Sequence, residues 1–200
     1  MSSAYGKIAR PQPRSTAAVT LPIVDRLKDG AAVRIERVDA VSAHAALIPE
    51  LRQLLNYEIE QGNTYPQEEP LDPTTFEAYF LSYDAFVALD EAGSLLGTFY
   101  VKPNFPGRCS HICNGGFLTH MDHRGRGVGK VMGRAFVKIA PSLGYKASMF
   151  NLVFANNVAS VELWRSLGFK EIGRVPKAGR LKGSDELVDA IMFYYDFESL

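Results

Sequence analysis

A glycine-rich loop between a strand-like segment and a strongly amphipathic segment constrains the fold of this 200-residue chain most. The loop, residues 123–130, reads HRGRGVGK and sets Arg124, Gly127 and Gly129 in an R-x-x-G-x-G pattern. A helix that begins there presents backbone N–H groups that lack intrahelical acceptors, and its macrodipole favours an anion. Glycines let a pyrophosphate approach the backbone closely, because a Cβ would stand in the way. The loop therefore predicts an anion site at a strand-to-helix turn.

Two familiar phosphate-binding classes and two broad partner classes fit the chain poorly. It contains no G-x-x-x-x-G-K-[ST] motif and no G-x-G-x-x-G in an early βαβ unit, so neither a P-loop nor a Rossmann fold is indicated. Lys and Arg (22) balance Asp and Glu (22), which disfavours nucleic acid as a partner. No apolar run approaches the roughly 18 residues that span a membrane. The basic charge at the loop is local and suits a small anionic ligand.

Hydrophobic periodicity predicts an alternation of strands and helices. Helices are expected over 47–61, 72–80, 128–143 and 157–167, each with a plausible cap or a glycine stop. Strands are expected over 32–38, 85–89, 94–102, 111–119, 146–154, 172–175 and 187–197. This order predicts an α/β (α+β) architecture: one layered domain, residues 32–200, around a mixed sheet.

Residues 1–31 are expected to form a flexible N-terminal tail. The first 24 residues contain Lys7, Arg10 and Arg14 but no acid, so a weak mitochondrial leader is the alternative. The expected location is accordingly the cytoplasm, with the mitochondrion as the second possibility.

A second motif, NVASVELWRSLGF at residues 157–169, follows the glycine loop at a fixed distance. Together the two motifs resemble the acyl-CoA-binding core of the GNAT superfamily of N-acetyltransferases. The resemblance implies a central, mostly antiparallel sheet flanked by helices, in which the fourth and fifth strands (111–119 and 146–154) splay apart. It implies acetyl-CoA as co-substrate and no metal.

Longer blocks are similar to one group within that superfamily, the fungal L-azetidine-2-carboxylate N-acetyltransferases. The blocks are EIEQGNTYPQ (58–67), GTFYVKPN (97–104), RCSHICNGGF (108–117) and the region 143–154. The similarity covers about residues 45–195. It implies acetylation of the ring nitrogen of azetidine-2-carboxylate, cis-4-hydroxyproline or a related proline analogue, a role in detoxification and oxidative stress, and a homodimer.

The resemblance also assigns residues to roles. Asn157 would be catalytic, either orienting the nucleophile or stabilising the oxyanion, although a simple N-cap role is open. Asn114 and Asn151 would hold the substrate, and Tyr65 would line its pocket. The cofactor would lie along a strand, a loop and a helix start, comprising Phe117, Leu118, Thr119, Arg124, Gly125, Arg126, Gly127, Val128, Gly129, Lys130, Asn157 and Trp164.

Three points remain open at this stage. Trp164 stands where many GNAT enzymes have a tyrosine acid, so acid catalysis by tyrosine is not carried over, and packing is its other role. No general base is evident, with Glu60 and His111 as candidate relays. Cys109, His111 and Cys113 alternate but lack a fourth zinc ligand. The functional alternatives are acetylation of another small amine or toxin, and a non-catalytic acyl-CoA sensor.

Overall fold

The computed structural model describes residues 19–198, in which an eight-stranded sheet has the order β1-β2-β3-β4-β5-β6-β8-β7. All neighbouring strands run antiparallel except β5 and β6. The expected mixed, mostly antiparallel sheet is therefore confirmed. The strands are β1 (Ile23–Arg26), β2 (Ala32–Val38), β3 (Asp84–Leu89), β4 (Leu95–Pro103), β5 (Ile112–Thr119), β6 (Ala147–Phe154), β7 (Lys170–Gly179) and β8 (Val188–Asp196).

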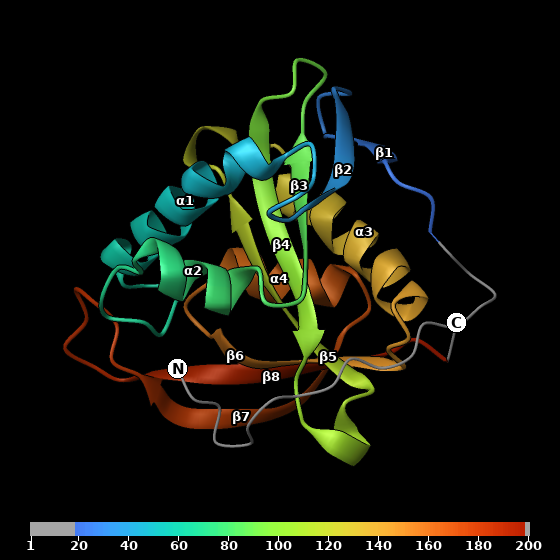
Figure 1. Cartoon of the computed structure of the whole chain (residues 1–200). Coiled ribbons are helices and arrows are strands. Elements are labelled where there is room, and N and C mark those ends of the chain that lie inside the picture. The colour runs from blue at the N-terminus through green and yellow to red at the C-terminus, as the bar shows by residue number, and fades with distance from the viewer. Residues whose placement is uncertain (1–18, 199–200) are drawn as a thin grey trace.

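Helices cover both faces of this sheet (Figure 1). Helices α1 (Ile48–Gln61) and α2 (Pro73–Phe80) pack with one hydrophobic cluster, and α3 (Val128–Ser142) and α4 (Val158–Ser166) pack with the other. Three single 3₁₀ turns, Ala45–Leu47, Gly107–Cys109 and Met121–His123, connect the elements. None of the helices within residues 19–198 has the length and apolar character needed to cross a bilayer.

The helix boundaries follow local chemistry. Asp72 caps α2 by accepting a hydrogen bond from the Thr75 amide at 2.9 Å, and Pro73 occupies the first turn, where its missing N–H costs nothing. Helix α1 ends at Gly62, whose φ of 67° is costly for residues with a Cβ. These signals are visible in the sequence, and the helices expected from them are confirmed.

Strand β1 corrects the domain boundary. Residues 23–26 lie in the segment expected to be a tail, yet they pair with β2, with Ile23 opposite Ile35. The segment is only four residues long, too short for alternation to distinguish it from a linker. The ordered domain thus begins before residue 32, whereas residues 1–18, the main part of the expected tail or leader, lie outside the described residues.

Strand β7 is longer than the expected 172–175. It extends over Lys170–Gly179 and lies at the sheet edge, pairing only with β8 among the described strands. Most of its residues are exposed, so the apolar alternation that reveals an inner strand is missing. A strand at an edge can be polar on much of its surface and still be held by backbone pairing.

The strands expected to splay do so. Strands β5 and β6 pair in parallel only at Ile112↔Ala147 and Cys113↔Ser148, although each strand has eight residues. Beyond this closed end the strands diverge, and their facing backbone edges are no longer bonded to each other. Helices α3 and α4 close one face of the gap, since Phe136 and Trp164 each contact Phe117 of β5 and Phe150 of β6. Helices α1 and α2 pack on the other face of the sheet.

We expect Phe136→Ala to lower the free energy of unfolding by about 3–5 kcal/mol, measured by urea denaturation. The Phe136 side chain is fully buried on α3 and contacts the rings of Phe99, Phe117 and Phe150. Ile172→Ala, at a half-exposed position of β7, is the control and should change the value by less than about 1 kcal/mol. Equal losses in the two variants would contradict the assignment of the core.

Candidate functional site

The backbone of β5 turns alternate residues toward the gap. The amide of His120 donates to Leu96 of β4 at 2.9 Å, whereas the carbonyl of His111 accepts from Lys146, which leads into β6, at 2.9 Å. Since strand residues alternate in direction, even-numbered residues of β5 direct their N–H and C=O groups to β4 and odd-numbered residues direct theirs to the gap. The gap-facing backbone groups belong to Gly115, Phe117 and Thr119.

These groups are not equivalent. Gly115 N–H already donates to Asn114 Oδ1 at 2.8 Å, whereas Phe117 and Thr119 face the gap beyond the last β5–β6 pair. Leu118, expected at the cofactor with them, points its backbone to β4 and its side chain into the buried α1/α2 cluster. The open edge thus consists of alternate residues, as an added extended ligand would need.

An aromatic cluster fixes this edge from the α3/α4 side. The ring of Trp164 lies 4.7 Å from that of Phe117 on β5 and 4.5 Å from that of Phe150 on β6. The Trp164 side chain is buried, and its indole N–H donates to Ser160 Oγ at 2.9 Å. Trp164 therefore packs between the diverging strands. Packing is one of the two roles expected for this residue, and contact with the cofactor is the other.

The glycine loop forms a turn lined by unpaired backbone amides at the open end of β5. Gly125 and Gly127 have φ angles of 76° and 95°, and α3 has no side-chain N-cap. The backbone N–H groups of residues 125–129 have no hydrogen-bond acceptor among residues 19–198. Successive unpaired amides at a helix start are a site for phosphate oxygens. This geometry is the one expected for Gly125, Arg126, Gly127, Val128 and Gly129.

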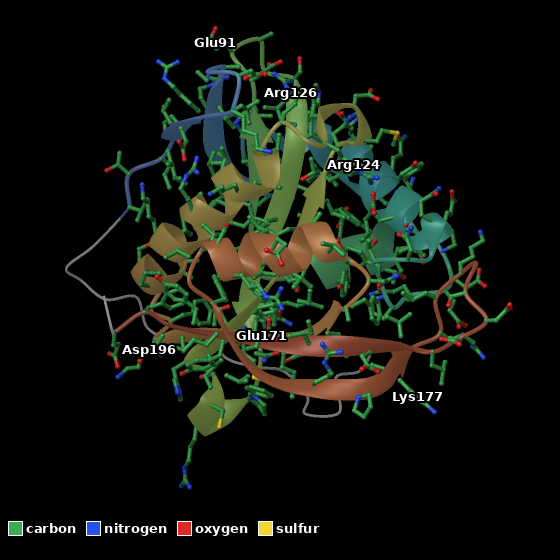
Figure 2. All side chains as sticks on the ribbon, turned by 180° about the vertical axis from the view of Figure 1, so that it is seen from behind. Glu91, Arg124, Arg126, Glu171, Lys177 and Asp196 are labelled. Carbon is green, nitrogen blue, oxygen red and sulfur yellow. The ribbon has the colours of Figure 1, made fainter. Side chains whose placement is uncertain are left out.

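The two arginines of the loop are paired with carboxylates on other elements. Arg124 forms an ion pair with Glu58 of α1, and Glu58 is buried and also accepts from Thr64 Oγ1 at 3.0 Å. Arg126 donates to Asp29 of the β1–β2 turn at 2.9 and 3.1 Å. Figure 2 shows both arginines at the end of the molecule where the Glu91 hairpin lies. Their guanidinium groups are paired with carboxylates, so the expected charge beside a pyrophosphate must come from other residues.

Two lysines at the loop are the candidates for that charge. Lys130, in the first turn of α3, is exposed and has no ion pair within the described part of the chain. Lys28 of the β1–β2 turn donates from Nζ to the Gly125 carbonyl at 3.2 Å, and its amide donates to the Arg126 carbonyl at 3.1 Å. Lys28 lies in the segment expected to be a tail, and for that reason sequence reasoning missed it.

Asn157 follows β6 and caps α4. Its Oδ1 accepts from the Ser160 amide at 3.2 Å, so the cap role is present. The side-chain N–H groups of Asn157 have no acceptor among the described residues, which leaves a donor at the open end of the gap. The cap and a chemical role can therefore coexist in one amide group.

A polar cluster lies on the α1/α2 side of β4 and β5. The Tyr79 and Tyr100 hydroxyls are 3.3 Å apart, and Lys102 Nζ lies 4.2 and 4.3 Å from the centres of their rings. The Tyr65 hydroxyl is buried without a hydrogen-bond partner among the described residues. Burial raises the pKa of the Tyr65 phenol well above its usual value, with Tyr79 and Glu58 adding to the shift. An orphaned hydroxyl beside the gap fits the pocket-lining role expected for Tyr65.

The expected substrate asparagines occupy different surroundings. Asn114, opposite Lys102 in the β4–β5 register, uses its Oδ1 for the Gly115 amide and keeps its NH₂ group available. Asn151 exchanges two hydrogen bonds with Asn104, at 2.6 and 2.9 Å. The structure thus places Asn114 in the polar cluster and ties Asn151 to the residue that follows β4.

Sequence reasoning missed Glu58, Lys102 and Asn104. Glu58 interrupts the apolar stripe of α1 between Leu55 and Ile59, and Lys102 interrupts a run of buried residues in β4. A charged residue at a buried position is the signal that could have found both. Of the expected relays, Glu60 is exposed and the His111 ring lies at 3.2 Å from the Arg108 carbonyl.

Comparison with known proteins gives consistent matches. The profile of the Acetyltransferase (GNAT) family matches residues 51–169. The N-acetyltransferase aca1 of Schizosaccharomyces pombe is 40% identical over 84% of this chain and 88% of its own length. The L-methionine sulfoximine/L-methionine sulfone acetyltransferase of Pseudomonas aeruginosa is 28% identical over 70% of this chain and 85% of its own. A solved GCN5-related N-acetyltransferase from Kribbella flavida superimposes with a TM-score of 0.75 at 26% identity, covering 82% of this chain and 97% of that one.

We expect Gly127→Ala to weaken coenzyme A binding at least tenfold in calorimetry. A Cβ at a φ of 95° costs roughly 1–2 kcal/mol, which strains the loop and its amides, and here it would also lie 3.2 Å from Lys28 Cγ, so the Lys28 side chain must give by a few tenths of an ångström. Gly93→Ala is the matched control, because Gly93 has a φ of 85° with open space around it in the β3–β4 turn. The control should lose similar stability and bind coenzyme A normally. Unchanged affinity in both variants would remove the loop from the binding site.

Proposed function

The chain belongs to the acetyltransferase (GNAT) family, and on this premise we propose that it acetylates the ring nitrogen of a small cyclic imino acid. Acetyl-CoA is the donor in this family, and azetidine-2-carboxylate, cis-4-hydroxyproline or a related proline-pathway compound is the proposed acceptor. The transfer would be direct, within a ternary complex and without an acyl-enzyme.

The observation that carries the proposal is the open backbone edge of β5 next to the unpaired amides of residues 125–129. An extended pantetheine arm can add to Phe117 and Thr119 as a strand would, while its pyrophosphate meets the loop. The thioester would then lie next to Phe117, between the loop and the closed end of the gap.

The substrate class is supported by how the longer sequence blocks converge. Block 58–67 supplies Glu58 and Tyr65, block 97–104 supplies Tyr100 and Lys102, and the next block supplies Asn114. These residues come from distant parts of the chain and meet on the α1/α2 side of the gap. Glu58 is already paired with Arg124, so the aromatic rings and the ammonium of Lys102 are left, and these suit a compact ring bearing a carboxylate.

The relatives support an amino-acid-like acceptor. The Pseudomonas aeruginosa relative is named for L-methionine sulfoximine and L-methionine sulfone, both α-amino acids. An α-imino acid presents the same neighbouring nitrogen and carboxylate. A cationic polyamine is disfavoured, because Lys102 would repel it in the polar cluster.

In the proposed reaction, the neutral ring nitrogen attacks the thioester carbonyl carbon, the new C–N bond forms and the C–S bond breaks. The ring nitrogen gives up one proton, and coenzyme A leaves as a thiolate that takes up a proton from solvent. The Phe117 amide and the Asn157 amide group are the donors proposed for the oxyanion of the tetrahedral intermediate. Such donors each contribute about 2.7–4 kcal/mol to acyl transfer.

Two alternatives and three further attributes are open to test. Acetylation of another small amine or toxin shares the cofactor site, and an acyl-CoA sensor would bind without turnover. We also propose that the protein acts as a cytoplasmic homodimer with a detoxifying role, as the family resemblance implies. Mass in solution by light scattering would test the dimer.

We expect incubation with acetyl-CoA and L-azetidine-2-carboxylate or cis-4-hydroxyproline to release free thiol and yield the N-acetyl product, detected by mass spectrometry. L-methionine sulfone and spermidine are the comparison substrates. Turnover of methionine sulfone alone would move the substrate class to acyclic amino acids. Acetyl-CoA binding with no turnover of any amine would favour the sensor.

We expect Asn157→Ala and Asn157→Asp each to reduce turnover at least tenfold while leaving acetyl-CoA affinity nearly unchanged. Aspartate can still accept from the Ser160 amide and cap α4, but it lacks the amide donor. The alanine variant should also lose about 0.5–2 kcal/mol of stability, and the aspartate variant should lose little. Normal turnover in Asn157→Asp would reduce Asn157 to a cap.

A further inference from the structure

We propose that Lys102 binds the carboxylate of the acceptor substrate through its ammonium group, with the Asn114 amide donating beside it. This inference rests on the proposed function and names the residue pair that selects the substrate class. Neither the glycine loop nor the α4 motif contains these residues.

The two side chains are neighbours by register. Lys102 on β4 is directly opposite Asn114 on β5, and directly paired residues hold their Cβ atoms roughly 4.5–5.5 Å apart on one face of a sheet. That face is the α1/α2 face, where Tyr100, two residues before Lys102, joins the buried cluster. The adjoining pair on β5 is Cys113↔Ser148, the last pair before the strands separate. The two donors therefore lie at the closed end of the gap.

The ammonium of Lys102 lacks a counterion. Its Nζ lies over the rings of Tyr79 and Tyr100, at 4.2 and 4.3 Å from their centres, and forms no hydrogen bond or ion pair with any residue from 19 to 198. By contrast, the arginines at the glycine loop both have carboxylate partners. Ring faces stabilise a cation only partly, and a buried charge without a partner is costly. A ligand carboxylate would supply the missing charge.

The surroundings favour an anion receptor over a base. The rings packed against Lys102 are the phenols of Tyr79 on α2 and Tyr100 on β4. Tyr65, from the α1–α2 connection, interacts with both of these tyrosines, and burial keeps the pKa of Tyr65 and Tyr100 well above the usual value. Burial also lowers the pKa of Lys102 to about 8, so the side chain is still mostly charged at neutral pH. Cation–π contacts require that charged form, whereas a general base requires the free lone pair.

The position also excludes the cofactor phosphates as the anion. The amides of residues 125–129 lie beyond the opposite end of β5, after Thr119. In an α-imino acid one carbon separates the carboxylate from the ring nitrogen. A carboxylate held by Lys102 and Asn114 therefore leaves the nitrogen directed along the gap-facing edge from Gly115 to Phe117, where the thioester is proposed to lie.

The test is a binding measurement on protein saturated with coenzyme A, which separates binding from turnover. L-azetidine-2-carboxylate is titrated by calorimetry, and its carboxamide is the uncharged probe. Wild type should bind the acid at least tenfold more tightly than the amide. Lys102→Met, which keeps the length of the side chain but not its charge, should lose that preference and bind coenzyme A normally. Lys102→Arg should recover part of the preference for the acid over the amide. Lys170→Met, at an exposed position of β7, is the control and should match wild type.

Each outcome is informative. Equal affinity of wild type and Lys102→Met for the acid would overturn the role of Lys102 and leave the proposed function standing. A wild type that turns over imino acids but binds the carboxamide more tightly would likewise overturn the role of Lys102 and leave the proposed function standing. If coenzyme A binds but neither L-azetidine-2-carboxylate nor L-methionine sulfone does, the substrate class of the proposed function fails and the inference fails with it.

The pH dependence gives an independent readout. Between pH 6.5 and 9.5, the affinity of wild type for the acid should fall as the pH rises through about 8, because Lys102 loses its charge. The bound carboxylate favours the ammonium form, so the pKa of Lys102 is higher in the complex and the fall should continue until the pH passes that higher value. Lys102→Met should show no such step. The same step in both proteins would assign it to another group and contradict the inference.

Discussion

The early end of pairing between β5 and β6 determines what this fold can bind. After Cys113 and Ser148 the two strands share no backbone hydrogen bonds, although they remain neighbours in one sheet. The strands are braced instead through side chains, because the Trp164 ring contacts Phe117 on one strand and Phe150 on the other. Aromatic packing therefore replaces the hydrogen-bond ladder on one face. The unpaired N–H and C=O groups are left for an extended ligand to complete.

The glycine loop continues this principle, since it too offers backbone groups in place of side chains. The conspicuous arginines, Arg124 and Arg126, pair with Glu58 and Asp29 and so connect the loop to α1 and to the β1–β2 turn. Both arginines are partly exposed, and exposed ion pairs contribute little to stability. Their effect is to fix where the loop lies. An anion at residues 125–129 would then be recognised by the direction of the amides more than by net charge.

The parts that could be predicted from the sequence are those fixed by local chemistry. The helices were predictable from Asp72 before Pro73, from the apolar stripe of α3 and from glycines with positive φ. The unpaired amides at the start of α3 were predictable from the glycine loop. Contacts between distant residues could not be predicted in this way. The Arg124–Glu58 pair joins residues 66 positions apart, and the Asn104–Asn151 pair joins residues 47 apart. Periodicity carries no information on such pairs, and the four-residue β1 is too short to show any.

Lys102 illustrates how a local conflict in a sequence can indicate a site. A lysine in a strand of buried residues costs stability, because folding disfavours its charged form. The pKa of Lys102 is lowered to about 8. Below this pH the cost of burying the charge lowers the free energy of unfolding in full, and above the ordinary lysine pKa this cost is absent. An apolar residue of similar length would avoid the cost, and a carboxylate neighbour would offset it, as at Arg124. Among residues 19–198, Lys102 has neither. The Lys102 charge lies beside Asn114, whose NH₂ group has no acceptor among the described residues, and beside an open strand edge. This charge is best explained by a counterion that arrives with the substrate.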